Sequence, residues 1–116
     1  LTYEMWRACR LVIDTGIHQY GWTRDQAVSY LRDHAALSER EINTEIDRYI
    51  SWPGQALAYK LGELQIRRHR KEAEDALGAK FDQRRFHDAI LAIGSVPLPV
   101  LEQRMNQFIA DERARP

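Results

Sequence analysis

The sequence predicts an all-α fold, a bundle-like array of five to six helices. Apolar residues recur at three- and four-residue spacing in successive segments, and no stretch alternates as a β-strand would. Capping-box motifs at Thr23 and Ser38 mark two helix starts. With 116 residues, of which 44% are hydrophobic, the chain can bury a core of its own. We therefore expect residues 1–116 to form a single helical unit with short connections.

The first three helices are predicted from apolar stripes and from the residues at their boundaries. An apolar stripe at helical spacing predicts a helix from the N-terminus to about His18. Thr23 and Gln26 form a capping box that starts a second helix, and Ser38 and Glu41 repeat this pattern before a third. In each box two side chains satisfy backbone amides that have no partner within the helix.

The third and fourth helices are predicted to meet at a break. Pro53 has no backbone N–H and disfavours a helical residue before it, so the third helix should end near Ile50. Because proline is tolerated in a first helical turn, the fourth helix is expected from Pro53 to about Leu77, with Gly78 as its stop. The first half of this helix is apolar and should be buried, whereas its second half is charged and should be solvated.

Two further helices complete the predicted fold. Asp82, or a residue beside it, is expected to cap a fifth helix that Gly94 terminates. Pro97 or Pro99 then starts a sixth.

The composition excludes several classes of function. Seventeen basic and seventeen acidic residues cancel, which gives no electrostatic argument for nucleic-acid or anionic-membrane binding. The basic run at residues 67–71 is followed by acidic residues, so we interpret it as a solvated face with local ion pairs. No apolar run approaches the ~20 residues of a membrane span. The lone cysteine, Cys9, is expected to be a small buried residue.

Catalytic motifs are absent from the chain. The four histidines are separated by sixteen or more residues, so no His-Glu-x-x-His zinc helix is present. There is also no Gly-x-Ser-x-Gly elbow. We expect no metal ligand and no cofactor site within these residues.

The helix break is the strongest candidate for a site. Gln55 and Tyr59 are four residues apart, and Tyr49 can approach from the preceding helix, so three polar groups are predicted to share a cleft. The alternative is that both tyrosines are core aromatics with satisfied hydroxyls and that Gln55 faces solvent.

The chain resembles a bacterial family known as domain of unknown function 885. The segments that carry the resemblance are residues 7–18, 21–22 and 48–62, with shorter matches at 76–78, 81–82, 86–88 and 94–98. Their order and spacing run across nearly all 116 residues, which correspond to the C-terminal part of the family's pattern. Because the chain also begins in helical pattern without an initiator methionine, we expect it to be the C-terminal fragment of a larger helical protein.

The resemblance implies a zinc peptidase. Full-length members look like helical metallopeptidases of the gluzincin type, often secreted or lipid-anchored, with a zinc helix and a later Glu-Gly-Trp segment. Both elements would precede Leu1. The chain would then supply the substrate-facing part of a cleft, without zinc ligands and without activity by itself. Its partners would be the N-terminal part of the parent protein and a peptide substrate, and it would contact neither nucleic acid nor membrane.

The same resemblance suggests roles for five residues. Tyr59 and Tyr49 are expected to donate hydrogen bonds to the oxyanion of the reaction, and Gln55 to contact the substrate backbone. Arg10 or His18 is expected to contact a substrate carboxylate.

Structural alternatives stay open for the last two residues. Arg10 can pair with Asp14 one helical turn away, and His18 can complement the helix dipole. For the whole chain the alternative is a non-catalytic helical structural or protein-interaction domain. Self-association into a homo-oligomer is also plausible for a fragment that lacks its neighbouring helices.

Overall fold

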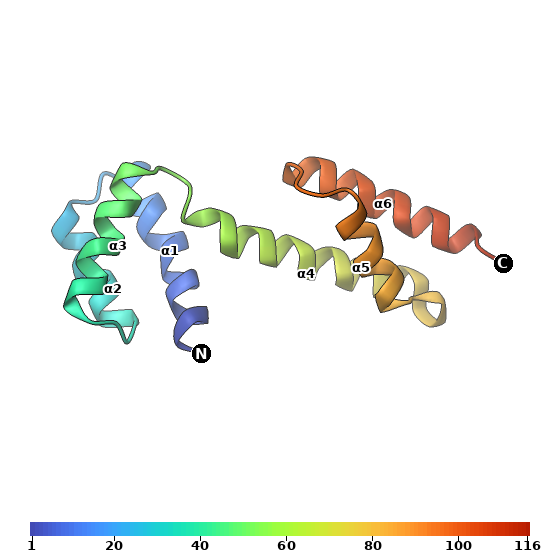
Figure 1. Ribbon diagram of the computed structural model, residues 1–116, viewed down its shortest axis with the longest axis horizontal. Coiled ribbons are helices and arrows are strands. Elements are labelled where there is room, and N and C mark those ends of the chain that lie inside the picture. Colours follow the sequence, from blue (N-terminus) through green and yellow to red (C-terminus); the bar gives the residue numbers. More distant parts are fainter. The chain divides into compact units, whose positions relative to one another are not determined.

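The structure, a computed structural model, describes residues 1–116 and confirms the all-α class (Figure 1). It contains no strand. Its elements are α1 (Thr2–His18), α2 (Arg24–His34), α3 (Glu39–Ser51), α4 (Leu57–Leu77), the short 3-10 helix η1 (Gly78–Lys80), α5 (Gln83–Ala92) and α6 (Leu98–Ala114). The chain divides into two compact units, Leu1–Leu61 and Gly62–Pro116, which are described separately. That residues 1–116 form a single domain therefore stays a prediction.

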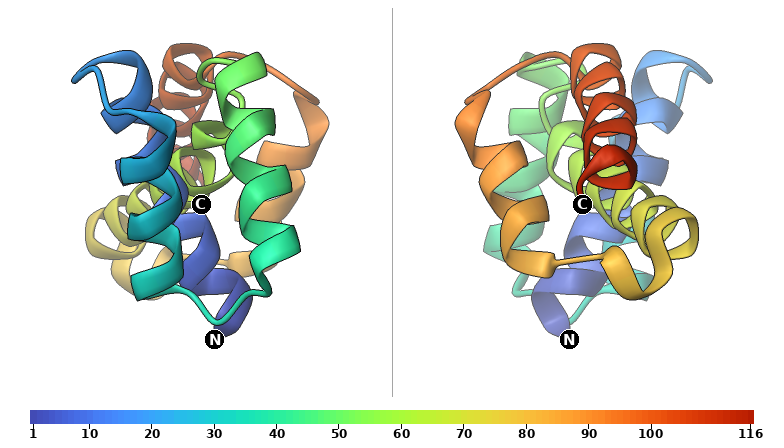
Figure 2. Two further views of the ribbon diagram at one scale, coloured as in Figure 1. Left: turned by 90° about the vertical axis from the view of Figure 1, so that its left-hand side faces the viewer. Right: turned by 90° about the vertical axis from the view of Figure 1, so that its right-hand side faces the viewer.

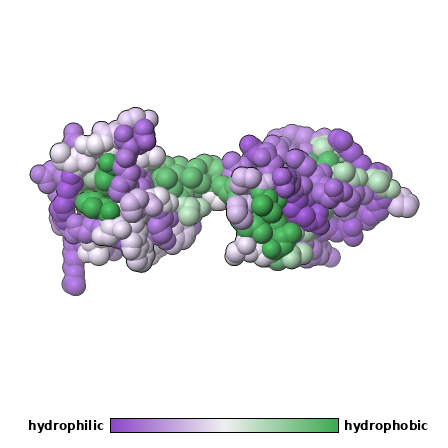
Figure 3. All heavy atoms as spheres, turned by 90° about the horizontal axis from the view of Figure 1, so that it is seen from above, coloured by the Kyte–Doolittle hydropathy of each residue, from purple (hydrophilic) through white to green (hydrophobic).

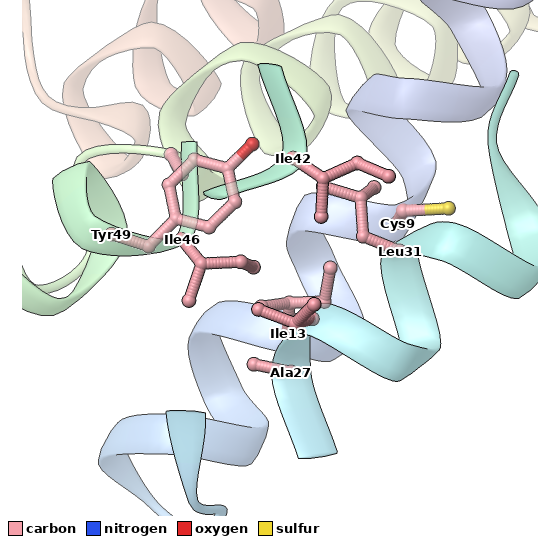
Figure 4. Close-up of a cluster of buried hydrophobic side chains, with 9 residues drawn as sticks. Cys9, Ile13, Ala27, Leu31, Ile42, Ile46 and Tyr49 are labelled. Carbon is pink, nitrogen blue, oxygen red and sulfur yellow. The ribbon is translucent and has the colours of Figure 1, made fainter. Parts of the chain in front are cut away.

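The first unit is built on α1, α2 and α3, which pack on one another (Figure 2). Their apolar stripes meet in a common core (Figure 4). The buried side chains are those of Cys9, Ile13, Ala27, Val28, Leu31, Ile42, Ile46, Tyr49 and Ala56. Cys9 is buried as expected, and burial raises the pKa of its thiol.

Both capping boxes form as predicted. The Thr23 hydroxyl accepts a hydrogen bond from the Gln26 backbone at 3.2 Å, and the Gln26 side chain accepts one from the Thr23 backbone at 2.8 Å. Ser38 and Glu41 make the corresponding pair at 3.3 and 2.9 Å. A cap of this kind contributes about 1 kcal/mol, so these two helix starts are determined locally.

Close packing links the end of α1 to the loop that follows it. The Trp22 backbone N–H donates to the Gly16 carbonyl at 2.9 Å, and the Trp22 indole covers the Gly16 Cα. A Cβ added to Gly16 would lie 2.5 Å from the indole. Glycine is therefore required at this position for steric reasons.

The helix break lies where it was predicted, but α4 begins at Leu57 and not at Pro53. Gly54 has φ of +79°, a conformation that cannot continue into a right-handed helix. The backbone instead forms a turn in which Gln55 N donates to Trp52 O at 3.2 Å. Gly54 N donates to the buried Asp14 carboxylate at 3.1 Å, so a side chain of α1 holds the turn.

The second unit contains the rest of α4 together with η1, α5 and α6. Its core consists of Ala73, Leu77, Phe86, Ala89, Leu101, Met105 and Phe108. The Asp82 carboxylate caps α5, accepting from Arg84 N at 2.8 Å, and Pro97 is the N-cap of α6, as predicted. Gly78 follows the last residue of α4 with φ of +51°, which confirms it as the stop.

The burial predicted for α4 is wrong. Its buried residues are His69, Ala73 and Leu77, all in the second half. Leu61 and Leu64 in the apolar first half are exposed. Figure 3 shows hydrophobic residues, coloured green, at the surface of the molecule. An apolar stripe shows which face of a helix avoids water, but a partner must be present to cover that face.

The basic run in α4 is solvated and ion-paired, as predicted. Its pairs are Arg67 with Glu63, Arg68 with Glu72 and Glu102, Arg70 with Glu74, and Lys71 with Asp75. His69 is the exception, because its ring is buried with Nδ1 3.1 Å from Glu72 Oε2. None of the helices combines the length and the apolarity needed to cross a membrane.

Candidate functional site

A pocket of about 240 Å³ lies in the first unit, beside the helix break. Its lining residues are Tyr3, Trp6, Arg7, Arg10, Arg48 and Tyr59. The four residues from α1 are spaced three, four and seven residues from the first, so they form one face of that helix. Arg48 is contributed by α3 and Tyr59 by α4. The pocket therefore combines aromatic rings with three guanidinium groups.

Glu45 links two of the arginines that line this pocket. Its carboxylate accepts from Arg10 Nη2 at 3.2 Å and from Arg48 Nη1 at 3.1 Å. It also accepts the hydroxyl proton of Tyr49 at 2.6 Å. Two cations and a phenol thus satisfy one partly buried carboxylate, which fixes Arg10 and Arg48 in place.

Tyr49 belongs to this network and does not line the pocket. Its ring is only 1% exposed, and its oxygen accepts from Trp6 Nε1 and from Arg10 Nε, each at 3.0 Å. Burial, with the hydrogen bond to Glu45, raises the pKa of Tyr49 to about 12, against the opposing effects of Arg10 and Trp6. Because its single proton is committed to Glu45, we do not assign Tyr49 a role as an oxyanion donor.

Tyr59 is placed differently from Tyr49. Its side chain is 46% exposed, and its oxygen accepts from Gln55 Nε2 at 3.1 Å. Gln55 Oε1 in turn accepts from Arg48 Nη2 at 2.9 Å. A guanidinium has only donors, so the amide oxygen must face Arg48 and the amide nitrogen must face Tyr59. The Tyr59 hydroxyl proton has no acceptor within the chain and is available to a ligand.

Arg10 is held by aromatic rings as well as by hydrogen bonds. Its Cζ lies 4.8 Å from the centre of the Trp6 ring and 5.2 Å from that of Tyr59. Cation–π contacts of this kind stabilise a guanidinium that has lost most of its water. Arg10 is 8% exposed and therefore has little freedom to move.

The alternative ion pair between Arg10 and Asp14 does not form. Arg10 pairs with Glu45, while Asp14 Oδ1 accepts from Gly54 N. The second carboxylate oxygen of Asp14 is buried without a hydrogen-bond partner.

The structure does not bring His18 and Arg10 to the same place. His18 Nε2 lies 2.9 Å from the Tyr49 carbonyl oxygen, which links the end of α1 to α3. The ring is not among the groups that line the pocket. The pair of Gln55 and Tyr59 does come together as the sequence predicted, although Gln55 precedes α4.

Sequence reasoning missed Trp6 and Arg7, and also Tyr3, Arg48 and Glu45, as site residues. The signal for the first two is the aromatic and basic stripe on α1, which also includes Tyr3 and Arg10. Aromatic and arginine side chains on one helix face indicate a recognition surface as readily as a core.

The residues present do not form a metal centre. No group of three or more His, Cys, Asp or Glu side chains is arranged to hold a metal ion.

Comparison with known proteins gives two matches of different kinds. A family model described as "Bacterial protein of unknown function (DUF885)" matches residues 1–105. A solved structure, "The crystal structure of the putative lipoprotein from Colwellia psychrerythraea", shares 46% sequence identity and a TM-score of 0.92 with the chain. This match covers 95% of the chain but 19% of the Colwellia protein, so the chain spans about a fifth of that protein's length. No curated protein matches the chain.

Proposed function

The chain belongs to the DUF885 family of bacterial proteins, and from that membership we propose that it is the C-terminal, substrate-facing part of a zinc-dependent peptidase. It supplies residues of the substrate cleft but none of the zinc ligands, and it is inactive alone. The resemblance of the family to gluzincin-type peptidases motivates the reaction class. The observation that carries the assignment to this chain is the Tyr59 hydroxyl, which lines a pocket with its proton free to donate.

Tyr59 has the properties that an oxyanion donor requires. Negative charge develops on the carbonyl oxygen during peptide hydrolysis, and a donor held in place beforehand stabilises it most effectively. The hydrogen bond from Gln55 holds the Tyr59 oxygen, and Arg48 holds Gln55. Each bond in such a chain polarises the next, which makes the Tyr59 O–H a stronger donor.

Gln55 has one donor left for a substrate. Its Oε1 is occupied by Arg48, and one of its two amide hydrogens is directed to Tyr59. The second amide hydrogen has no acceptor within the chain and is able to donate to a peptide carbonyl. Gln55 is thus mainly a positioning residue for Tyr59, with a single backbone contact as its direct role.

The zinc ion of this proposal belongs to the rest of the parent protein. A peptidase zinc ion supplies an activated water and polarises the peptide carbonyl. No group of three or more His, Cys, Asp or Glu side chains in this chain is placed to hold such an ion. Since the chain covers 19% of the Colwellia protein, a related parent has ample length to contribute the ligands.

We also propose that the parent is secreted or lipid-anchored in a bacterium. The description of the Colwellia relative as a "putative lipoprotein" supports this location. The remainder of the parent is the partner that we propose for this chain.

A second candidate function is a non-catalytic helical structural or protein-interaction domain. The buried network of Tyr49, Glu45, Arg10 and Trp6 favours it, because such a network ties α1 to α3 whether or not a substrate binds. The two candidates differ in what Tyr59 does, since the structural candidate gives its exposed hydroxyl no task.

The test is peptidase activity of the zinc-loaded parent with Tyr59→Phe, using Tyr20→Phe as the matched control. Tyr20 is also exposed and lies in the loop after α1. We expect Tyr59→Phe to lower kcat at least tenfold, a loss of about 1.4 kcal/mol of transition-state stabilisation, with KM nearly unchanged. Tyr20→Phe should match the wild type. Equal kcat in all three proteins would remove Tyr59 from the mechanism, and a parent without zinc-dependent cleavage would overturn the peptidase proposal.

A further inference from the structure

The pocket beside the helix break carries an excess of positive charge. Three guanidinium groups line it, from Arg7, Arg10 and Arg48, and the carboxylate that pairs with two of them is Glu45, which leaves a formal surplus of two positive charges. Arg7 makes no ion pair and no hydrogen bond through its side chain. Guanidinium groups bind oxyanions strongly, because their planar donors match the two oxygens of a carboxylate.

Two of these arginines have donors that the chain leaves unused. Arg10 bonds Tyr49 through Nε and Glu45 through Nη2, so its Nη1 has no protein partner and is not fully buried. Arg48 uses both of its terminal nitrogens, and its Nε is buried without a partner. The Arg48 Nε has almost no accessible surface, so the unused donor that is open to a ligand is Arg10 Nη1. Because Arg10 is already held rigidly, it binds a ligand with little further loss of entropy.

The size of the pocket limits what it accepts. Its volume of about 240 Å³ is below the roughly 300–1,000 Å³ that encloses a complete small-molecule ligand. It equals about eight water molecules of ~30 Å³ each. The pocket therefore suits the terminal group of a longer ligand. The rings of Tyr3 and Trp6, stacked with their centres 5.9 Å apart, offer a flat surface to an apolar side chain beside the anion.

We propose that this pocket binds the C-terminal carboxylate of a peptide, together with the side chain of its last residue. The inference rests on the peptidase function proposed above and specifies its substrate class. Arg7 and Arg10 bind the carboxylate, and Arg48 supports it. Tyr59, the proposed oxyanion donor, lines the same small pocket, and a peptide residue spans about 3.5 Å. The scissile bond therefore lies one or two residues from the carboxyl terminus, and the parent shortens peptides from that end.

The first test measures binding to this 116-residue chain without any catalysis. The probes are N-acetylphenylalanine and its amide, which differ only in the negative charge, and binding is followed by NMR titration. We expect the acid to bind at least tenfold more tightly than the amide. Arg7→Gln should lower the affinity for the acid at least tenfold. Arg84→Gln, the same change at an exposed site on α5, should leave the affinity unchanged.

Three outcomes of this titration would overturn the proposal. They are equal binding of acid and amide, no binding of the acid at millimolar concentration, and an unchanged affinity in Arg7→Gln. Inorganic phosphate is titrated as a further probe. If phosphate binds more tightly than the acid, the pocket is a phosphate site and the assignment to a peptide terminus is wrong.

The second test uses the zinc-loaded parent with one peptide in free-acid and C-terminally amidated forms. We expect amidation to lower kcat/KM at least tenfold, and Arg7→Gln to remove most of that difference. If both forms are cleaved equally, the peptidase proposal survives and the carboxylate proposal fails. If neither form is cleaved while the chain binds the acid selectively, the peptidase proposal fails and the carboxylate site stands.

Discussion

At the residue scale, Tyr49 is the side chain whose ionisation is most strongly coupled to folding. The folded chain raises its pKa from an ordinary value of 10 to about 12. Because the folded state holds this proton more tightly, the associated stabilisation is complete below pH 10 and is lost as the pH rises through 12. Two pKa units correspond to roughly 2–3 kcal/mol of unfolding free energy. The test is to measure the free energy of unfolding with denaturant at pH values from 9 to 12, for the wild type and for Tyr49→Phe. Over this range the wild type should lose roughly 2–3 kcal/mol more unfolding free energy than the variant.

A control for this titration is available in the remaining tyrosines. The chain has five, and four of them stay in the Tyr49→Phe variant, so their titration cancels in the comparison. Phenolate absorbance should show that the wild type has one late-titrating tyrosine that the variant lacks. If both proteins lose stability in parallel with alkali, Tyr49 is not the group responsible.

The candidate site was predictable where its contacts are local and unpredictable where they are not. Gln55 and Tyr59 are four residues apart, and this spacing was enough to predict that their side chains meet. The hydrogen-bond partners of Tyr49, in contrast, include Trp6 and Arg10, which are 43 and 39 residues away in the sequence. The sequence left open whether Tyr49 and Tyr59 are core aromatics or cleft residues, and the structure gives a different answer for each, with Tyr49 buried and Tyr59 exposed. An apolar stripe indicates the buried face of α1 but not which helix packs on that face.

At the element scale, two helical glycines offer opposite predictions for the same substitution. Gly16→Ala places a methyl group within 2.5 Å of the Trp22 ring, and overpacking of this kind costs about 1–3 kcal/mol. Gly62→Ala in α4 meets nothing within 4 Å and should stabilise the chain by about 0.5–1 kcal/mol through helix propensity. Thermal unfolding by circular dichroism measures both. A stabilised Gly16→Ala variant would show that Trp22 moves away without cost.

The boundaries of the helices show the same contrast between local and distant causes. The starts of α2 and α3 were predicted because a capping box is complete within four residues. The start of α4 was misplaced because Asp14 holds the Gly54 amide across 40 residues and stabilises a turn where proline alone would permit a helix. Pro53 was enough to locate the break, whereas the conformation of the turn depends on the tertiary contact between Asp14 and Gly54.

At the scale of the whole molecule, the apolar first half of α4 is helical as predicted, but it is exposed where burial was predicted. Leu61 and Leu64, three residues apart on one face of α4, are both exposed. Exposed neighbouring leucines of this kind often mark a surface that another part of a protein covers. The Colwellia protein, of which the chain spans 19%, has further residues, and in the parent proposed above such residues would be able to cover this stretch. We propose that the rest of the parent packs on this stretch.

Leu64→Lys tests that packing, because the same change has different expected effects in two contexts. In this chain alone Leu64 is 47% exposed, and a substitution there should change the free energy of unfolding by less than about 0.5 kcal/mol. In the parent, a covered leucine contributes roughly 1.5–3 kcal/mol, and a buried lysine adds a desolvation penalty. Denaturant unfolding should therefore show a loss of at least about 2 kcal/mol in the parent only. Equal changes in unfolding free energy in both proteins would mean that this stretch faces solvent in the parent too. A loss of unfolding free energy in the isolated chain that grows with protein concentration would instead indicate that copies of the chain cover the stretch.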